Sequence, residues 1–203
     1  MKSGQGPFGR LFALEQSKAA YLADFVLLCA FIAGLATFLL VTGAHARRAE
    51  LTAFALLGLS GWTLVEYVVH RFVLHGLEPF QRWHALHHRR QTELIYAPTI
   101  LTVGVVMGLV LLPAWMLGDL SPACAAMLGL LIGYLAYSIT HHAVHHWSAD
   151  SSWLRRRKRW HALHHRSSQP RGRYGVVTAF WDHVFRSAVE PRLSERRDPL
   201  RLR

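Results

Sequence analysis

The octapeptide RWHALHHR occurs twice in the chain, at residues 82–89 and again at residues 159–166. Each copy carries three histidines with the spacing i, i+3 and i+4. These histidines are His84, His87 and His88 in the first copy and His161, His164 and His165 in the second. Such positions project from one face of a helix. We therefore expect the three imidazoles of each copy to converge on one point, as the ligands of a metal ion do.

Two further histidine clusters precede the two copies of the octapeptide. In the run HHAVHH at residues 141–146, His141 and His145 are four residues apart and share a helical face. His70 and His75 are five residues apart, a spacing that an ideal α-helix would splay. We expect the helix to end or to bulge there, and π-bulges are frequent at functional sites.

Metal binding explains this pattern better than its alternatives do. Only His45 and His183 of the 14 histidines lie outside the clusters, and both are interpreted as structural or interfacial residues. A pH sensor would not need repeated ligand spacing. About ten convergent imidazoles exceed one coordination sphere and suit two metal ions. Imidazole alone does not select iron over zinc or copper.

The composition indicates a membrane protein, because 52% of the residues are hydrophobic and only 17% are charged, yet the net charge is +11. Four apolar segments have about the length of roughly 20 residues that a transmembrane helix needs. We predict these spans at about Tyr21–Gly43, Leu51–Val73, Ile95–Leu117 and Cys124–His142. The two cysteines lie in apolar runs and support neither a disulfide framework nor a cysteine metal site.

The distribution of Lys and Arg predicts that both termini and the histidine clusters are cytoplasmic. Basic residues occur before the first span, after the second and after the fourth, whereas the link at residues 118–123 has none. Arg47 and Arg48 do not fit this orientation. The run RRRKR at residues 155–159 follows a span directly, so we expect contact with lipid headgroups rather than with nucleic acid.

Several motifs resemble the fatty acid hydroxylase/sterol desaturase superfamily. The motifs HRFVLH, HALHH, HHAVHH and a second HALHH match its histidine pattern. The stretches EYVVHRFVLH, YSITHHAVHH and YGVVTAFWDHVF are most similar to fatty acid (sphingolipid) 2-hydroxylases. The resemblance covers about Leu51 to Phe185. It implies an all-α membrane protein with four transmembrane helices and a cytosolic helical cap, at about residues 75–94 and 143–190, that holds a histidine-rich dimetal site. The whole chain, residues 1–203, is expected to be one such domain.

The resemblance also implies site residues, cofactors and partners. Two iron ions, with zinc possible in purified samples, would oxidise C–H bonds of a lipid or fatty acyl chain with O2. The implied metal ligands are His70, His75, His84, His87, His88, His141, His145, His161, His164 and His165. His146 is expected to be an additional ligand or the partner of one. Glu66 and Asp182 are expected to accept hydrogen bonds from ligand imidazoles, and Tyr137 to donate to a ligand or to line the substrate path.

The sequence departs from the family pattern in three places. No cytochrome b5-like segment precedes the first span, so we expect electrons from a separate donor of the cytochrome b5 or ferredoxin type with its reductase. RRQTELIYAPT follows the first HALHH in place of an acidic, proline-rich stretch, and Arg186-Ser187 replaces a common Gly-Thr. Two alternatives therefore stay open. One is another superfamily oxidase, such as a carotenoid or sterol hydroxylase or a lipid desaturase. The other is a metal transporter or sensor, which would be expected to hold its ligands near the bilayer midplane.

Overall fold

The computed structural model describes residues 17–42, 45–95, 99–117, 120–166 and 172–188. For residues 45, 99–101, 110–114 and 117 it describes the backbone but not the side chains. Every regular element of the described residues is helical, which confirms the all-α prediction. The elements are α2 (Lys18–Thr42), η1 (His45–Arg47), α3 (Arg48–Val68), η2 (Val69–Leu74), α4 (Phe80–Arg89), α5 (Thr99–Leu117), α6 (Leu120–His146), α7 (Ser152–Arg166) and α8 (Phe180–Val184). η1 is a 3-10 helix and η2 a π-helix.

Three of these helical segments are long and apolar enough to cross a membrane: Lys18–Thr42, Arg48–Leu74 and Leu120–His146. Their outward surfaces carry large apolar side chains, including Leu40 and Val41 on α2 and Leu56 on α3, each at least 60% exposed. A soluble monomer rarely exposes so continuous an apolar surface. The three segments correspond to the first, second and fourth predicted spans. The protein is therefore an integral membrane protein.

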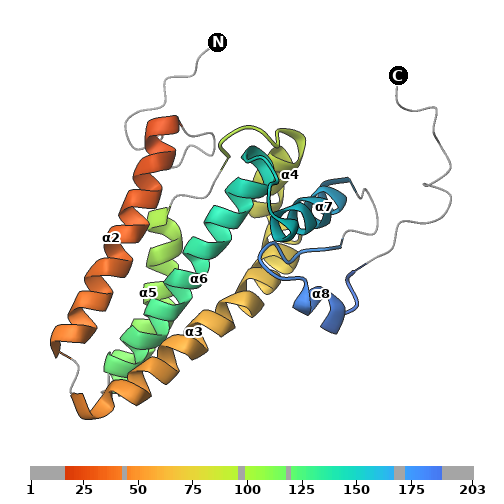
Figure 1. Cartoon of the computed structure of the whole chain (residues 1–203). Coiled ribbons are helices and arrows are strands. Elements are labelled where there is room, and N and C mark those ends of the chain that lie inside the picture. Colours follow the sequence, from red (N-terminus) through yellow and green to blue (C-terminus); the bar gives the residue numbers. More distant parts are fainter. Residues whose placement is uncertain (1–16, 43–44, 96–98, 118–119, 167–171, 189–203) are drawn as a thin grey trace, which may run out of the picture.

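The third predicted span corresponds to α5, a helix of 19 residues. In Figure 1, α5 lies between α2 and α6. Several of its side chains lie outside the described part of the chain, so a fourth crossing stays a prediction.

The most extensive packing joins α3 and α6, which approach each other through glycines. A Cβ atom added at Gly58 would lie 2.0 Å from the carbonyl oxygen of Ala126, and one added at Gly129 would lie 1.9 Å from that of Ala55. Small residues at a helix crossing allow such close backbone contact inside a membrane. The buried core beside this crossing is formed by Leu28, Trp62, Val103, Met127, Leu131 and Tyr134.

The short helices gather at one end of the bundle. Figure 1 shows α4, α7 and α8 near the C-terminal ends of α3 and α6, while η1 lies at the opposite end. The first RWHALHHR falls on α4 and the second on α7. The fold therefore carries both copies of the repeat to the same end of the long helices, where the HHAVHH run of α6 also ends.

At the opposite end, Arg47 forms an ion pair with Glu50, with Nε 2.9 Å from Oε2. This pairing offsets the charge of one of the two arginines that do not fit the predicted orientation. Both cysteines are free thiols, which agrees with the absence of a predicted disulfide framework.

Candidate metal centre

Nine histidines form two compact groups at the end of the bundle where α4, α7 and α8 lie. Within each group, one ring nitrogen of every member lies within 4.8 Å of those of all the others. The five-histidine group contains His70, His75, His84, His88 and His164. The four-histidine group contains His87, His141, His145 and His161. Two separate groups of convergent imidazoles match the prediction of two metal positions.

The spacing of His70 and His75 has the expected structural cause. Residues 69–74 form the π-helix η2, and His75 is its C-cap. A π-helix closes hydrogen bonds from i to i+5, which brings residues five apart to the same side. The two imidazole rings consequently stack with centroids 5.2 Å apart. The bulge predicted between these histidines is confirmed.

The three histidines of each octapeptide do not converge on one point, which corrects our expectation. On α4, His84 and His88 belong to the five-histidine group, whereas His87 belongs to the other. On α7 the roles are reversed, because His164 joins the five-histidine group and His161 the other. Positions i and i+4 differ by about 40° around a helix, whereas i+3 and i+4 differ by 100°. Each copy therefore contributes to both groups.

His165 extends the four-histidine group. Its Nε2 lies 2.9 Å from Nε2 of His161, and its ring stacks on that of His88 with centroids 4.2 Å apart. It falls outside the set in which all ring nitrogens lie within 4.8 Å. His165 thus lies between the two groups and contacts both.

In the five-histidine group, backbone carbonyls orient two of the rings. His70 donates from Nδ1 to the carbonyl of Tyr174 at 2.5 Å, and His164 donates from Nδ1 to that of Gly172 at 2.7 Å. A neutral imidazole that donates from Nδ1 carries its lone pair on Nε2. Both Nε2 atoms are therefore available to a metal ion.

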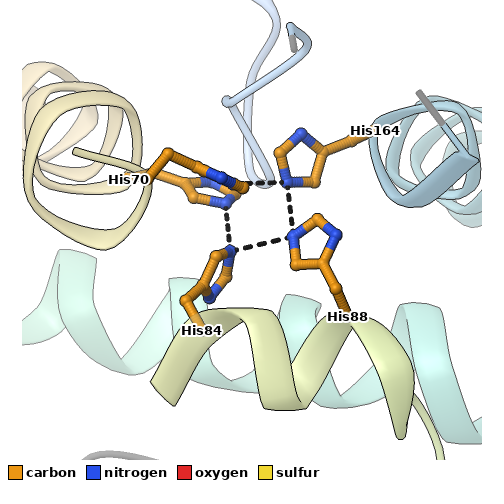
Figure 2. Close-up of side chains that lie close together, drawn as sticks. His70, His84, His88 and His164 are labelled. Carbon is orange, nitrogen blue, oxygen red and sulfur yellow. Dashed lines mark hydrogen bonds between the residues drawn. The ribbon is translucent and has the colours of Figure 1, made fainter. Parts of the chain in front are cut away.

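The Nε2 atoms of the five-histidine group have the separations of metal ligands. Figure 2 shows His84 and His88 reaching from α4 toward His70 and His164. The Nε2 atom of His164 lies 3.1 Å from those of both His75 and His88. One lone pair accepts only one hydrogen bond, but nitrogens 2.0–2.1 Å from a common metal ion are about 3 Å apart when they subtend a right angle. The geometry fits a metal ion.

The four-histidine group also has the geometry of a metal site. Nε2 of His145 lies 2.9 Å from Nε2 of His161, and the His87 and His141 rings are 4.8 Å apart. Both ring nitrogens of His87 are buried and have no hydrogen-bond partner within the described part of the chain. Buried polar atoms are rarely left unpaired. A metal ion at this position would give them a partner.

The buried imidazoles on α4 and α7 are held in the neutral form that binds metal. Burial, followed by the charge of His145, lowers the pKa of His87 to about 3. Burial likewise lowers the pKa values of His84 and His161 well below the usual range, with His70 and His141 as the next causes. At pH 7 these rings are uncharged, so metal binding needs no proton release from them.

Glu66 and Asp182 contact the site through a loop rather than directly, which corrects the predicted hydrogen bonds to imidazoles. Glu66 Oε1 accepts from the backbone N–H groups of Val176 and Val177 at 2.5 and 3.1 Å. Asp182 accepts from the N–H groups of Tyr174 and Gly175 at 2.9 and 2.8 Å. The carboxylates therefore fix the loop whose carbonyls orient His70 and His164. These carbonyls could not be predicted from the sequence, because every residue type carries one.

Tyr137 contacts a histidine by ring stacking. Its ring is 5.7 Å from that of His141 and inclined by 16°. The same ring is stacked on Tyr134 at 6.3 Å and lies 6.2 Å from Trp62. Among the described residues, Tyr137 donates no hydrogen bond to an imidazole. The other role expected of Tyr137, lining the substrate path, stays a prediction.

His146 belongs to neither group of convergent ring nitrogens. It is exposed and stacks on His142 at 4.5 Å. His142 in turn pairs with the hydroxyl of Tyr21 at 3.0 Å. On α6 these two histidines follow His141 and His145 by one residue, so they project about 100° away. His183, interpreted as structural, is also exposed and lies beside Trp160, with ring centroids 5.6 Å apart.

These features define a class, a helical membrane protein with two all-imidazole groups at one end of its long helices. The chain belongs to the fatty acid hydroxylase family, whose profile matches residues 55–187. The match contains every histidine of both groups, from His70 to His164. The resemblance noted in the sequence is thereby confirmed.

The relatives that the chain matches are lipid hydroxylases. It is 33% identical over 143 residues to the dihydroceramide fatty acyl 2-hydroxylase FAH2 of Arabidopsis thaliana, covering 63% of this chain and 57% of that protein. It is 32% identical over 149 residues to the fatty acid 2-hydroxylase of Rattus norvegicus, covering 66% of this chain and 39% of that protein. The matched region thus spans 57% of the length of the first of these relatives and 39% of the second.

A solved structure has the same fold. The structure titled full-length scs7p, in which only the hydroxylase domain is visible, superposes with a TM-score of 0.74 and covers 92% of this chain and 71% of that one. The sequence identity of 23% makes this similarity evidence for the fold alone.

Proposed function

We propose that the protein is a membrane-bound di-iron oxygenase that hydroxylates the acyl chain of a lipid or fatty acid. The observation that carries this proposal is the pair of all-imidazole groups, with their Nε2 atoms at ligand separations. The family membership and the names of its relatives, acyl 2-hydroxylases, support the reaction and the substrate class. O2 is the proposed co-substrate.

The proposed metal ligands are the nine histidines of the two groups together with His165. Bound iron would supply the O2 activation that oxidation of an unactivated C–H bond requires. The protein contributes neutral, buried imidazoles in fixed orientations. Because imidazole ligands also accept zinc, a purified sample is expected to contain some zinc.

The proposed topology has four transmembrane helices, α5 included, within a single domain over residues 1–203. The cap formed by α4, α7 and α8 would face the cytoplasm with both termini. This arrangement lets an acyl chain reach the metal centre from the bilayer while its headgroup stays in the hydrated interface. It also puts the basic residues of α7 on the side favoured by the positive-inside rule.

The proposed electron source is a separate donor protein of the cytochrome b5 or ferredoxin type. Arg156 and Arg159 lie exposed on α7, the helix that also carries His161, His164 and His165. Exposed basic side chains accelerate encounter with an acidic partner and also favour anionic lipid headgroups. Either interaction would lie close to the proposed centre.

The test is a lipid analysis of cells that express the full-length protein together with a reductase and donor. We expect 2-hydroxyacyl lipids to accumulate with the wild-type chain and to be absent with the double variant His75→Ala/His145→Ala, which removes one ligand from each group. Mass spectrometry of total lipids measures the products. Desaturated or ring-hydroxylated products in place of 2-hydroxyacyl lipids would assign the chain to another oxidase of the superfamily. O2-independent metal flux in liposomes would instead indicate transport.

A further inference from the structure

The two histidine groups differ in how firmly their rings are held. In the five-histidine group, His70 and His164 each donate from Nδ1 to a carbonyl of the same loop, at Tyr174 and Gly172. In the four-histidine group, Nδ1 of His161 and both ring nitrogens of His87 are buried without a partner among the described residues. Contacts with the loop therefore fix the tautomers of two rings in the first group, whereas His87 and Nδ1 of His161 have no such support among the described residues.

The loop that orients the first group is itself held by two buried carboxylates. The four consecutive N–H groups of residues 174–177 all donate to Asp182 or Glu66. Asp182 is 0% exposed and Glu66 4%. Asp182 also accepts from the hydroxyl of Ser187 at 2.7 Å. Four backbone hydrogen bonds to two buried side chains therefore hold this loop in place.

A small cavity borders the second group. A cavity of about 10 Å³ is lined by three of its four members, His87, His141 and His145, and by Tyr21 and Gln91 among others. No member of the five-histidine group lines this cavity. A cavity of this size holds about one water molecule. A water molecule in this cavity would lie beside these three rings and would take a coordination position on an ion bound there.

We infer that the two metal positions are inequivalent: the five-histidine group binds its ion first and tightly, and the four-histidine group binds more weakly and exchanges. Asp182 and Glu66 are positioning residues for the tight position, because they act on His70 and His164 through the loop. This inference rests on the proposed function, since it requires both groups to hold metal. Loss of a partner that orients a metal-bound histidine typically lowers metal affinity 10–100-fold.

The experiment titrates the metal-stripped full-length protein in detergent with Co(II), followed by its visible absorption. We expect two binding steps, separated at least 10-fold in Kd. His75→Ala should remove the tight step and His145→Ala the weak one. Asp182→Asn places an amide N–H against a backbone N–H or the Ser187 hydroxyl, and it should weaken the tight step 10–100-fold while leaving the weak step unchanged.

Thr63→Val is the matched control, because Thr63 lies on α3 near Glu66 and accepts a hydrogen bond from the α8 residue Trp181 at 3.0 Å without contacting the loop. It should change neither step. Where Asp182→Asn does not fold, Glu66→Gln serves as the second variant, with a smaller weakening of the tight step expected. Two steps of equal affinity, or equal weakening of both steps by the carboxylate variants, would overturn the inference and leave the proposed function standing. Failure of the wild-type chain to bind Co(II) would overturn both.

Discussion

Replacing His145 by alanine is expected to lower formation of the hydroxylated lipid by more than about 100-fold. His145 belongs to the four-histidine group, and its Nε2 lies 2.9 Å from that of His161. Even the loss of a residue that only orients a ligand typically costs 10–100-fold in activity or metal affinity, so the loss of a ligand should cost more. Mass spectrometry of the products measures this effect, and elemental analysis should find one metal ion per chain in place of two.

His146→Ala is the matched control for this prediction. The two histidines are neighbours on α6, but His146 is exposed and stacks on His142 outside both groups. We expect His146→Ala to retain two metal ions and nearly full activity. Equal losses of activity and of bound metal in the two variants would contradict the prediction. They would show that both substitutions disturb α6 and that His145 is not an individual metal ligand.

Removal of the metal ions is expected to lower the melting temperature by roughly 8–16 °C. A ligand present at 1,000 times its Kd stabilises the folded state by about 4 kcal/mol. For a chain of this size, 1 kcal/mol corresponds to roughly 2–4 °C. The imidazoles also join α4, α6 and α7 to η2, so metal removal leaves buried ring nitrogens such as those of His87 unpaired. Thermal unfolding in detergent, with and without a chelator, measures the shift.

The double variant His75→Ala/His145→Ala provides the comparison, because each substitution removes one ligand from a different group. Its melting temperature should respond to the chelator much less than that of the wild-type chain. A chelator that leaves the wild-type melting temperature unchanged would mean that the histidine groups do not hold stabilising metal ions.

The sequence was most informative where spacing alone determines geometry. The separation of five positions from His70 to His75 predicted a bulge, and a π-helix covers residues 69–74. The separation of four positions from His141 to His145 predicted a shared face, and their rings are 4.8 Å apart. The apolar runs predicted three of the membrane-spanning helices to within a few residues, because hydrophobic length is a property of the chain itself.

Other features depend on tertiary contacts that spacing does not encode. The angle between positions i+3 and i+4 allows three histidines either to share one ion or to divide between two, and only the packing of α4 against α7 and η2 decides between these outcomes. The supporting carbonyls of Gly172 and Tyr174 are backbone atoms in a loop. Glu66 and Asp182 were recognised as site residues, but their true partners lie about 110 and 8 residues away in the sequence.

The central claim is that the two histidine groups hold two metal ions in an all-nitrogen environment. Anomalous X-ray diffraction from crystals of the protein, recorded at the absorption edges of iron and zinc, tests it most directly. We expect two anomalous peaks per chain, one among His70, His75, His84, His88 and His164 and the other among His87, His141, His145 and His161. Absence of anomalous density at both positions in protein purified without chelator, with the rings paired only to each other, would contradict it.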